Sequence, residues 1–126
     1  MAGVTLDTGV FMALERRQRR ALAFWEKWAL NKTALTAPAV VIAEWWRERG
    51  WNAARLLDAV EIETGRRRAR ARRWRSARRA RLGRERTIDA IVMASAAQRG
   101  DTVYTSDFDD MARLATRFPG VRVLGV

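Results

Sequence analysis

Acidic side chains are the main candidates for chemistry in this 126-residue chain, because it contains no histidine and no cysteine. Without cysteine there are no disulfides, thiol nucleophiles or thiolate metal sites, and without histidine there is no serine–histidine–aspartate triad and no histidine-ligated zinc. Acid–base work would therefore fall to carboxylates or to water activated by a metal. Hard oxygen ligands of this kind suit Mg²⁺ or Mn²⁺.

Two of the acids follow directly after predicted strands. Asp7 comes after the short apolar run 4–6, and Asp107 comes just after the strand predicted over 102–105. In open α/β sheets, sites form at the carboxyl ends of the strands. We therefore expect both side chains to project into the same crevice.

Two further acids lie on predicted helices. Asp89 falls near the start of a helix over 88–98 that Thr87 would cap, where a helix N-terminus favours an ionised carboxylate. Glu44 falls in the middle of an apolar helix over 39–49, where a charge needs a partner. A divalent cation would turn the mutual repulsion of such carboxylates into attraction.

Each acid also has an ordinary structural interpretation. Asp7 could be a helix cap, Asp89 could simply complement a helix dipole, and Glu44 could pair with Arg47 or Arg55. The remaining group, Asp107, Asp109 and Asp110, could be a solvated helix start. Their joint arrangement is what favours a site.

The elements that would position these acids alternate along the chain, which predicts an α/β fold with a central, mostly parallel, twisted sheet of four to five strands and helices on both faces. We see no internal repeat and no linker, so a single domain over 1–126 is expected. Thr8 would cap the first helix, and Pro38 would open the third. Strands are expected over 4–6, 35–37, 60–63, 102–105 and 121–124. Helices are expected after Thr8 and over 20–30, 39–49, 51–59, 66–82, 88–98 and 108–116.

The net charge of +11 comes almost entirely from arginine and predicts a polyanionic partner. Arginine fills more than half of the segment 66–82, and Arg84 and Arg86 lie close in sequence to Asp89, so these two are candidate contacts for RNA phosphates. A solvated helix face, or an arginine-rich composition with no binding role, explains the same charge.

Six tryptophans are many for this length. They could stack RNA bases, but packing in the core or at a dimer interface is favoured. No apolar run reaches the roughly 18 residues of a membrane helix, and the N-terminus does not have the pattern of a signal peptide, so we expect a cytoplasmic protein without a membrane partner.

Four short segments together resemble a known family. They are Leu6-Asp7-Thr8-Gly9-Val10, Ala37 to Glu44 (Ala-Pro-Ala-Val-Val-Ile-Ala-Glu), Ile88 to Ala96 (Ile-Asp-Ala-Ile-Val-Met-Ala-Ser-Ala) and Thr105 to Asp110 (Thr-Ser-Asp-Phe-Asp-Asp). In order, spacing and predicted secondary structure they resemble the PIN domain, and within it the VapC-type toxins of type II toxin–antitoxin pairs.

The resemblance implies a PIN-like fold and a Mg²⁺- or Mn²⁺-dependent endoribonuclease, a hydrolase that dimerises and is held inactive by a cognate antitoxin. Carried over to this sequence, Asp7 and Asp89 would be the main metal ligands, and Glu44 and Asp107 would complete a catalytic cluster. Further roles would fall to Asp110 at a second metal, and to Thr8 and Ser106 as hydroxyls that orient the carboxylates, while Asp109 would face solvent.

The segment from Arg66 to Arg86 is more arginine-dense than the resemblance leads us to expect. It could grip RNA, dock an acidic antitoxin segment, or face solvent. Two other functions stay open: a stand-alone RNA-processing nuclease of the PIN type without an antitoxin, and a non-catalytic basic module that binds RNA or DNA.

Overall fold

The structure is a computed structural model that describes residues 3–46, 53–63 and 84–126. Its centre is one five-stranded sheet in the order β3-β2-β1-β4-β5, and every neighbouring pair is parallel. The expected α/β fold is confirmed. The strands are β1 (Val4–Leu6), β2 (Leu35–Pro38), β3 (Glu61–Glu63), β4 (Thr102–Thr105) and β5 (Arg122–Gly125).

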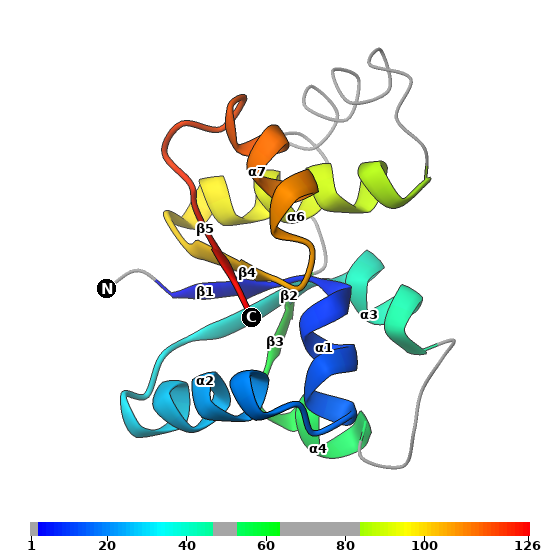
Figure 1. Cartoon of the computed structure of the whole chain (residues 1–126), viewed down its shortest axis with the longest axis vertical. Coiled ribbons are helices and arrows are strands. Elements are labelled where there is room, and N and C mark those ends of the chain that lie inside the picture. The colour runs from blue at the N-terminus through cyan, green and yellow to red at the C-terminus, as the bar shows by residue number, and fades with distance from the viewer. Residues whose placement is uncertain (1–2, 47–52, 64–83) are drawn as a thin grey trace.

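Helices cover both sides of the sheet (Figure 1). On one side, α6 contacts β1, β2 and β4, and α7 packs on α6 and β5. On the other side, α1 contacts β4 and α2. The helices in chain order are α1 (Thr8–Glu15), α2 (Arg19–Leu30), α3 (Ala39–Trp46), α4 (Ala53–Asp58), α6 (Arg84–Arg99) and α7 (Phe108–Ala115).

The strand order reverses direction between β1 and β4. The chain first lays down β1, β2 and β3 in one direction across the sheet and then returns to β4 and β5 on the other side of β1. At such a switch point the helices on either side diverge, and ligands bind outside the carboxyl ends of the two strands. The residue that follows β1 is Asp7.

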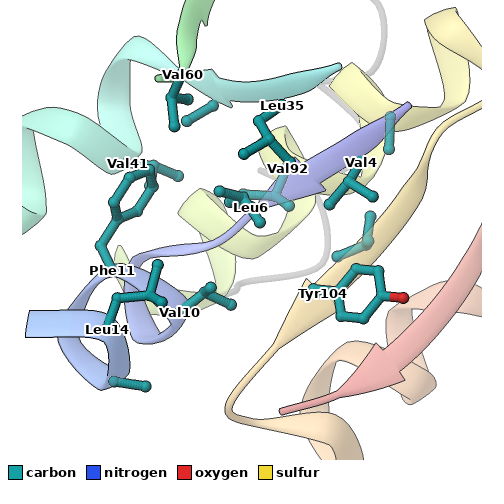
Figure 2. Close-up of a cluster of buried hydrophobic side chains, with 14 of the residues drawn as sticks. Val4, Leu6, Val10, Phe11, Leu14, Leu35, Val41, Val60, Val92 and Tyr104 are labelled. Carbon is teal, nitrogen blue, oxygen red and sulfur yellow. The ribbon is translucent and has the colours of Figure 1, made fainter. Parts of the chain in front are cut away.

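The core lies on both faces of the inner strands, and the residues of two of these strands, β1 and β2, are all buried. This pattern is typical of parallel strands covered by helices on both sides. Figure 2 shows Leu6 among Val10, Leu35 and Val92, with Phe11 and Val41 close by. Burial of these apolar side chains is the main force that fixes the edge of the sheet where the acids lie.

Tryptophans contribute to this packing where their side chains are described. Trp45 is fully buried, with its ring centroid 4.9 Å from that of Phe11, and its indole N–H donates to Glu15. Trp28 packs edge-on against Tyr104 with centroids 4.8 Å apart. The packing interpretation is thus confirmed for these two, whereas Trp51 and Trp74 lie outside the described residues.

A polar network fixes α6 on the sheet. The Arg99 guanidinium donates to Asp101 at 2.9 Å and to Glu63, and it also reaches Ser95 and Thr5 at 2.8 Å each. Asp101, which is 5% exposed, also accepts from the hydroxyl of Thr5 and from a backbone N–H near the start of β1. Because these partners come from β1, β3, α6 and the start of β4, the network sets where α6 lies along the sheet.

Two predicted helix caps are wrong. The first helix is capped by Asp7, whose carboxylate accepts the Val10 N–H, and Thr8 is the first helical residue. The helix predicted to begin after Thr87 begins instead at Arg84, so Thr87 is inside it. Pro38 ends β2 and does not open α3. The helix predicted over 66–82 lies outside the described residues. None of the described helices is long and apolar enough to cross a membrane.

Candidate active site

Asp7 is a buried carboxylate fixed on both oxygens. Its Oδ1 accepts the Val10 N–H at 3.0 Å, and the Thr105 hydroxyl donates to its Oδ2. The pKa of Asp7 is raised to about 6, mainly by burial. These two hydrogen bonds and one from the Gly9 N–H lower the pKa, and the charge of Asp107 raises it further. The predicted position after the first strand is confirmed, and the ordinary interpretation as a helix cap is also true.

Asp89 lies within the electrostatic influence of four other acids. Its pKa is raised to about 7, first by burial and then by four neighbouring carboxylates. Those four come from separate places in the chain: Asp7 after β1, Asp107 after β4, Asp110 on α7 and Glu44 on α3. The fold therefore gathers all five acids singled out in the sequence at one edge of the sheet.

The sequence argument about Asp89 nevertheless requires a correction. Because α6 begins at Arg84, Asp89 is its sixth residue and lies beyond the first turn, where the helix dipole acts most strongly. We expected the helix terminus to keep this carboxylate ionised. Burial and the neighbouring negative charges instead favour its protonated form.

Glu44 is half-buried on α3 and accepts a hydrogen bond from the Thr8 hydroxyl. This contact joins the start of α1 to α3 and holds the Glu44 carboxylate toward the cluster. The alternative that Glu44 pairs with Arg47 or Arg55 concerns arginine side chains that lie outside the described part of the chain.

Asp107 and Asp110 form the exposed side of the cluster. Asp107 precedes α7, but its side chain makes no capping hydrogen bond, and its backbone N–H donates to Thr105 Oγ1 at 2.9 Å. The side chain of Asp110 is 44% exposed, and its Oδ1 lies 3.9 Å from the Arg113 guanidinium on the same helix. Asp109 faces solvent, as predicted.

Two residues that build the site were missed by the sequence analysis. The fully buried Thr105 donates to Asp7 and accepts from Asp107, so it joins the ends of β1 and β4. Gly9 allows the start of α1 to approach the segment after β4: a Cβ at this position would lie 1.7 Å from Ser106 Oγ and 2.9 Å from Ser106 Cβ. The sequence did contain signals for both residues: Thr105 is a hydroxyl residue at the end of a predicted strand, and Gly9 comes two residues after the first acid.

The remaining predicted residues are placed in part. Ser106 is exposed and lies over Gly9, and its role in orienting a carboxylate stays a prediction. Arg84 and Arg86 lie in the first turn of α6, before Asp89, but their side chains are outside what the structure describes. RNA contact by either arginine therefore stays a prediction too.

The donor chemistry of the cluster fits a hard divalent cation. All five acids offer carboxylate oxygens, and the negative charges around Asp89 repel one another. Among the described residues, however, no three acidic side chains lie close enough to hold an ion without moving. Asp107, exposed and uncapped, is the carboxylate whose side chain can most readily turn inward.

Comparisons with known proteins identify the fold. No family model matches the chain, and no curated protein matches it in sequence. It is similar to a solved structure of VapBC2 from Rickettsia felis bound to a DNA fragment from their promoter, with TM-score 0.66, 14% identity and 98% coverage of both chains. It is also similar to FitAB bound to an IR36 DNA fragment, with TM-score 0.64, 19% identity, and coverage of 97% of this chain and 94% of that one.

These findings overturn the identification of the chain as a VapC-type toxin of the PIN-domain family. Identities of 14% and 19% show the fold alone, and both matches are to assemblies of a toxin with its antitoxin, without indicating which component the chain resembles. The resemblance of the four short motifs was too little to assign a family. What the structure and the comparisons do establish is a PIN-like α/β fold.

Proposed function

We propose that this chain is a metal-dependent ribonuclease that hydrolyses RNA phosphodiester bonds at the carboxylate cluster, with Mg²⁺ or Mn²⁺ as cofactor. The observation that carries the proposal is the convergence of four carboxylates on Asp89, a residue whose pKa is raised to about 7, first by burial and then by those four charges. Within the described residues, the charged groups with the largest effects on the pKa of Asp89 are four other acids. Such a cluster is unfavourable on its own and becomes favourable around a cation.

A bound divalent cation supplies Lewis-acid chemistry, because it polarises phosphate oxygens and lowers the pKa of water. The chain supplies the frame. The N–H of Val10 and the hydroxyl of Thr105 hold Asp7 in one orientation. The hydroxyl of Thr8 holds Glu44. In this proposal Asp7 and Asp89 are the main ligands, Glu44 and Asp107 complete the cluster, and Asp110 serves a second ion.

RNA as the substrate is supported by charge. The whole chain carries a net charge of +11, although the cluster itself is acidic. Arginines outside the cluster can attract phosphates while the carboxylates act on one of them. Binding should therefore weaken steeply as the salt concentration rises.

The test is cleavage of RNA by purified protein in Mg²⁺ or Mn²⁺, with EDTA as the metal-free control. Asp7→Asn keeps an N-cap side chain and removes the charge, so we expect folding with at least a hundredfold loss of cleavage, in the range seen when one charge-stabilising group is removed. Asp109→Asn is the matched control, because it removes a solvent-facing acid beside the cluster and should leave cleavage unchanged. Equal cleavage by Asp7→Asn and the parent protein would refute the proposal.

We further propose that the chain works in a toxin–antitoxin pair with a protein partner. The supporting observation is that both similar structures are toxin–antitoxin assemblies. If the chain is the toxic component, its expression should arrest growth, Asp7→Asn should abolish the arrest, and the protein encoded by a neighbouring gene should relieve it. If expression of the unaltered chain is harmless, the chain is not the toxic component; if it also forms no complex with the protein from the neighbouring gene, the proposed pair is refuted.

A further inference from the structure

Phe108 is an exposed aromatic side chain beside the carboxylate cluster. It is the first residue of α7 and follows Asp107, one of the acids that act on Asp89. Its exposed fraction is 48%, which makes it one of three large hydrophobic side chains that are exposed in the described part of the chain. The other two, Leu30 and Ile62, lie at the end of α2 and on the edge strand β3.

Phe108 lies against the end of β5. A Cβ on Gly125 would be 3.7 Å from the Phe108 Cβ and 3.9 Å from its Cδ2, which is ordinary van der Waals contact. The side chain therefore has backbone of the edge strand on one side while nearly half of its surface is open. Among the described residues, Phe108 is not one of the side chains packed against the core.

We propose that Phe108 is a stacking platform for a nucleobase of single-stranded RNA next to the phosphate held at the cluster. This inference rests on the proposed ribonuclease function and adds how the substrate is held. Aromatic rings beside a nuclease site stack bases of any sequence, because every base has a flat π-face.

The negative charge of the cluster explains why an uncharged binding contact would be needed beside it. The acids around Asp89 repel phosphates until a cation is bound, so charge does not help to hold RNA at the cluster itself. An uncharged ring contributes binding that does not depend on the phosphate. It would fix one nucleotide while the arginines elsewhere hold the backbone.

The experiment compares a short single-stranded oligoribonucleotide with a base-free ribose–phosphate strand of equal length and charge. Affinities are measured by fluorescence anisotropy in EDTA, where no metal-dependent cleavage takes place. We expect the protein to bind the intact RNA roughly tenfold more tightly than the base-free strand, and Phe108→Ala to remove most of that difference. Phe108→Trp should retain it, and Leu30→Ala is the matched control that should change neither affinity.

Three results would overturn the inference. One is equal weakening of both strands in Phe108→Ala, which would indicate a folding or charge effect and not stacking. Another is no weakening of either strand. The third is dependence on Phe108 for an oligodeoxyribonucleotide but not for RNA. Because the assay measures binding without cleavage, its result is independent of the cleavage test. The binding assay can reject stacking on Phe108 while the cleavage test supports the ribonuclease activity, and the two results can also be the other way round.

Discussion

The burial of Asp89 and the carboxylates around it should destabilise the protein in the absence of metal, and Asp89→Asn tests this directly. In the unfolded chain Asp89 has its ordinary pKa of 3.8, but in the folded protein its pKa is about 7. Between these values the folded state keeps a proton that the unfolded state has released. Raising the pH therefore works against folding, and the free energy of unfolding falls until about pH 7.

The magnitude follows from the same two values. Each tenfold change in proton affinity corresponds to about 1.4 kcal/mol, so the full difference sets an upper bound of about 4 kcal/mol. Asp89 is only partly buried, and solvent screening reduces this to about 1–2 kcal/mol. Asn has a similar shape and no charge. We therefore expect Asp89→Asn to be about 1–2 kcal/mol more stable than the parent protein at about pH 8 and nearly equal to it at about pH 4.

The assay is urea denaturation followed by tryptophan fluorescence, in EDTA at both pH values and again with excess Mg²⁺ or Mn²⁺. A metal at a hundred times its dissociation constant adds about 2.7 kcal/mol to the protein that binds it. The parent protein should gain this stability and the variant should not, so metal should reverse their order. Asp109→Asn should match the parent protein throughout, because Asp109 faces solvent.

One result would refute the reasoning. If Asp89→Asn in EDTA is no more stable than the parent protein at the higher pH, the native carboxylate is not under the repulsion that the structure indicates. The proposal of a cation at the cluster would then lose its physical basis.

Three other contacts lead to predictions about stability. Gly9→Ala should lower the free energy of unfolding by about 1–3 kcal/mol, because the added Cβ overlaps Ser106, but in a Ser106→Gly background it should be neutral or stabilising. An equal loss of stability in both backgrounds would exclude this clash. Thr105→Val should lower the free energy of unfolding by about 1–3 kcal/mol, because it leaves Asp7 Oδ2 and the backbone N–H of Asp107 without the Thr105 hydroxyl. It should also weaken metal binding measured by calorimetry, and unchanged metal affinity would contradict the role of Thr105 in holding Asp7. Arg99→Met should cost about 1–3 kcal/mol by urea denaturation because it leaves the buried Asp101 without its cation, and a neutral result would show that the network does not hold α6.

The sequence predicted the framework of the site because the relevant signals are local. The run Val4–Leu6 is followed by Asp7, and the predicted strand over 102–105 is followed, after Ser106, by Asp107. Parallel strands place all their carboxyl ends at one edge, so the alternation of strands and helices was enough to bring Asp7 and Asp107 together. The structure confirms this edge and the order of the elements.

The electrostatic state of the site could not be predicted in the same way. The pKa of Asp89 depends first on its burial and then on four carboxylates from outside its helix, and no local pattern gives either the burial or the distances. The expected helix start at Thr87 also placed Asp89 closer to the helix terminus than it is. Thr105 and Asp7 are 98 residues apart, so their hydrogen bond exists only once the sheet has formed.

Two buried acids with different surroundings show what distinguishes a structural carboxylate from a candidate ligand. Asp101 and Asp7 are both 5% exposed, and both accept hydrogen bonds from a backbone N–H and a threonine hydroxyl. Asp101 also has the guanidinium of Arg99 at 2.9 Å, whereas the charge that acts on Asp7 is the negative one of Asp107.

The protein is therefore able to give a buried acid a cation of its own, and it does so where the acid holds α6 on the sheet. At the cluster the described residues add further carboxylates instead. Burying charge without compensation costs several kcal/mol, and sequences that fold stably avoid it unless the missing charge comes from elsewhere. This contrast within one molecule is the strongest reason to look for a divalent cation at Asp7 and Asp89.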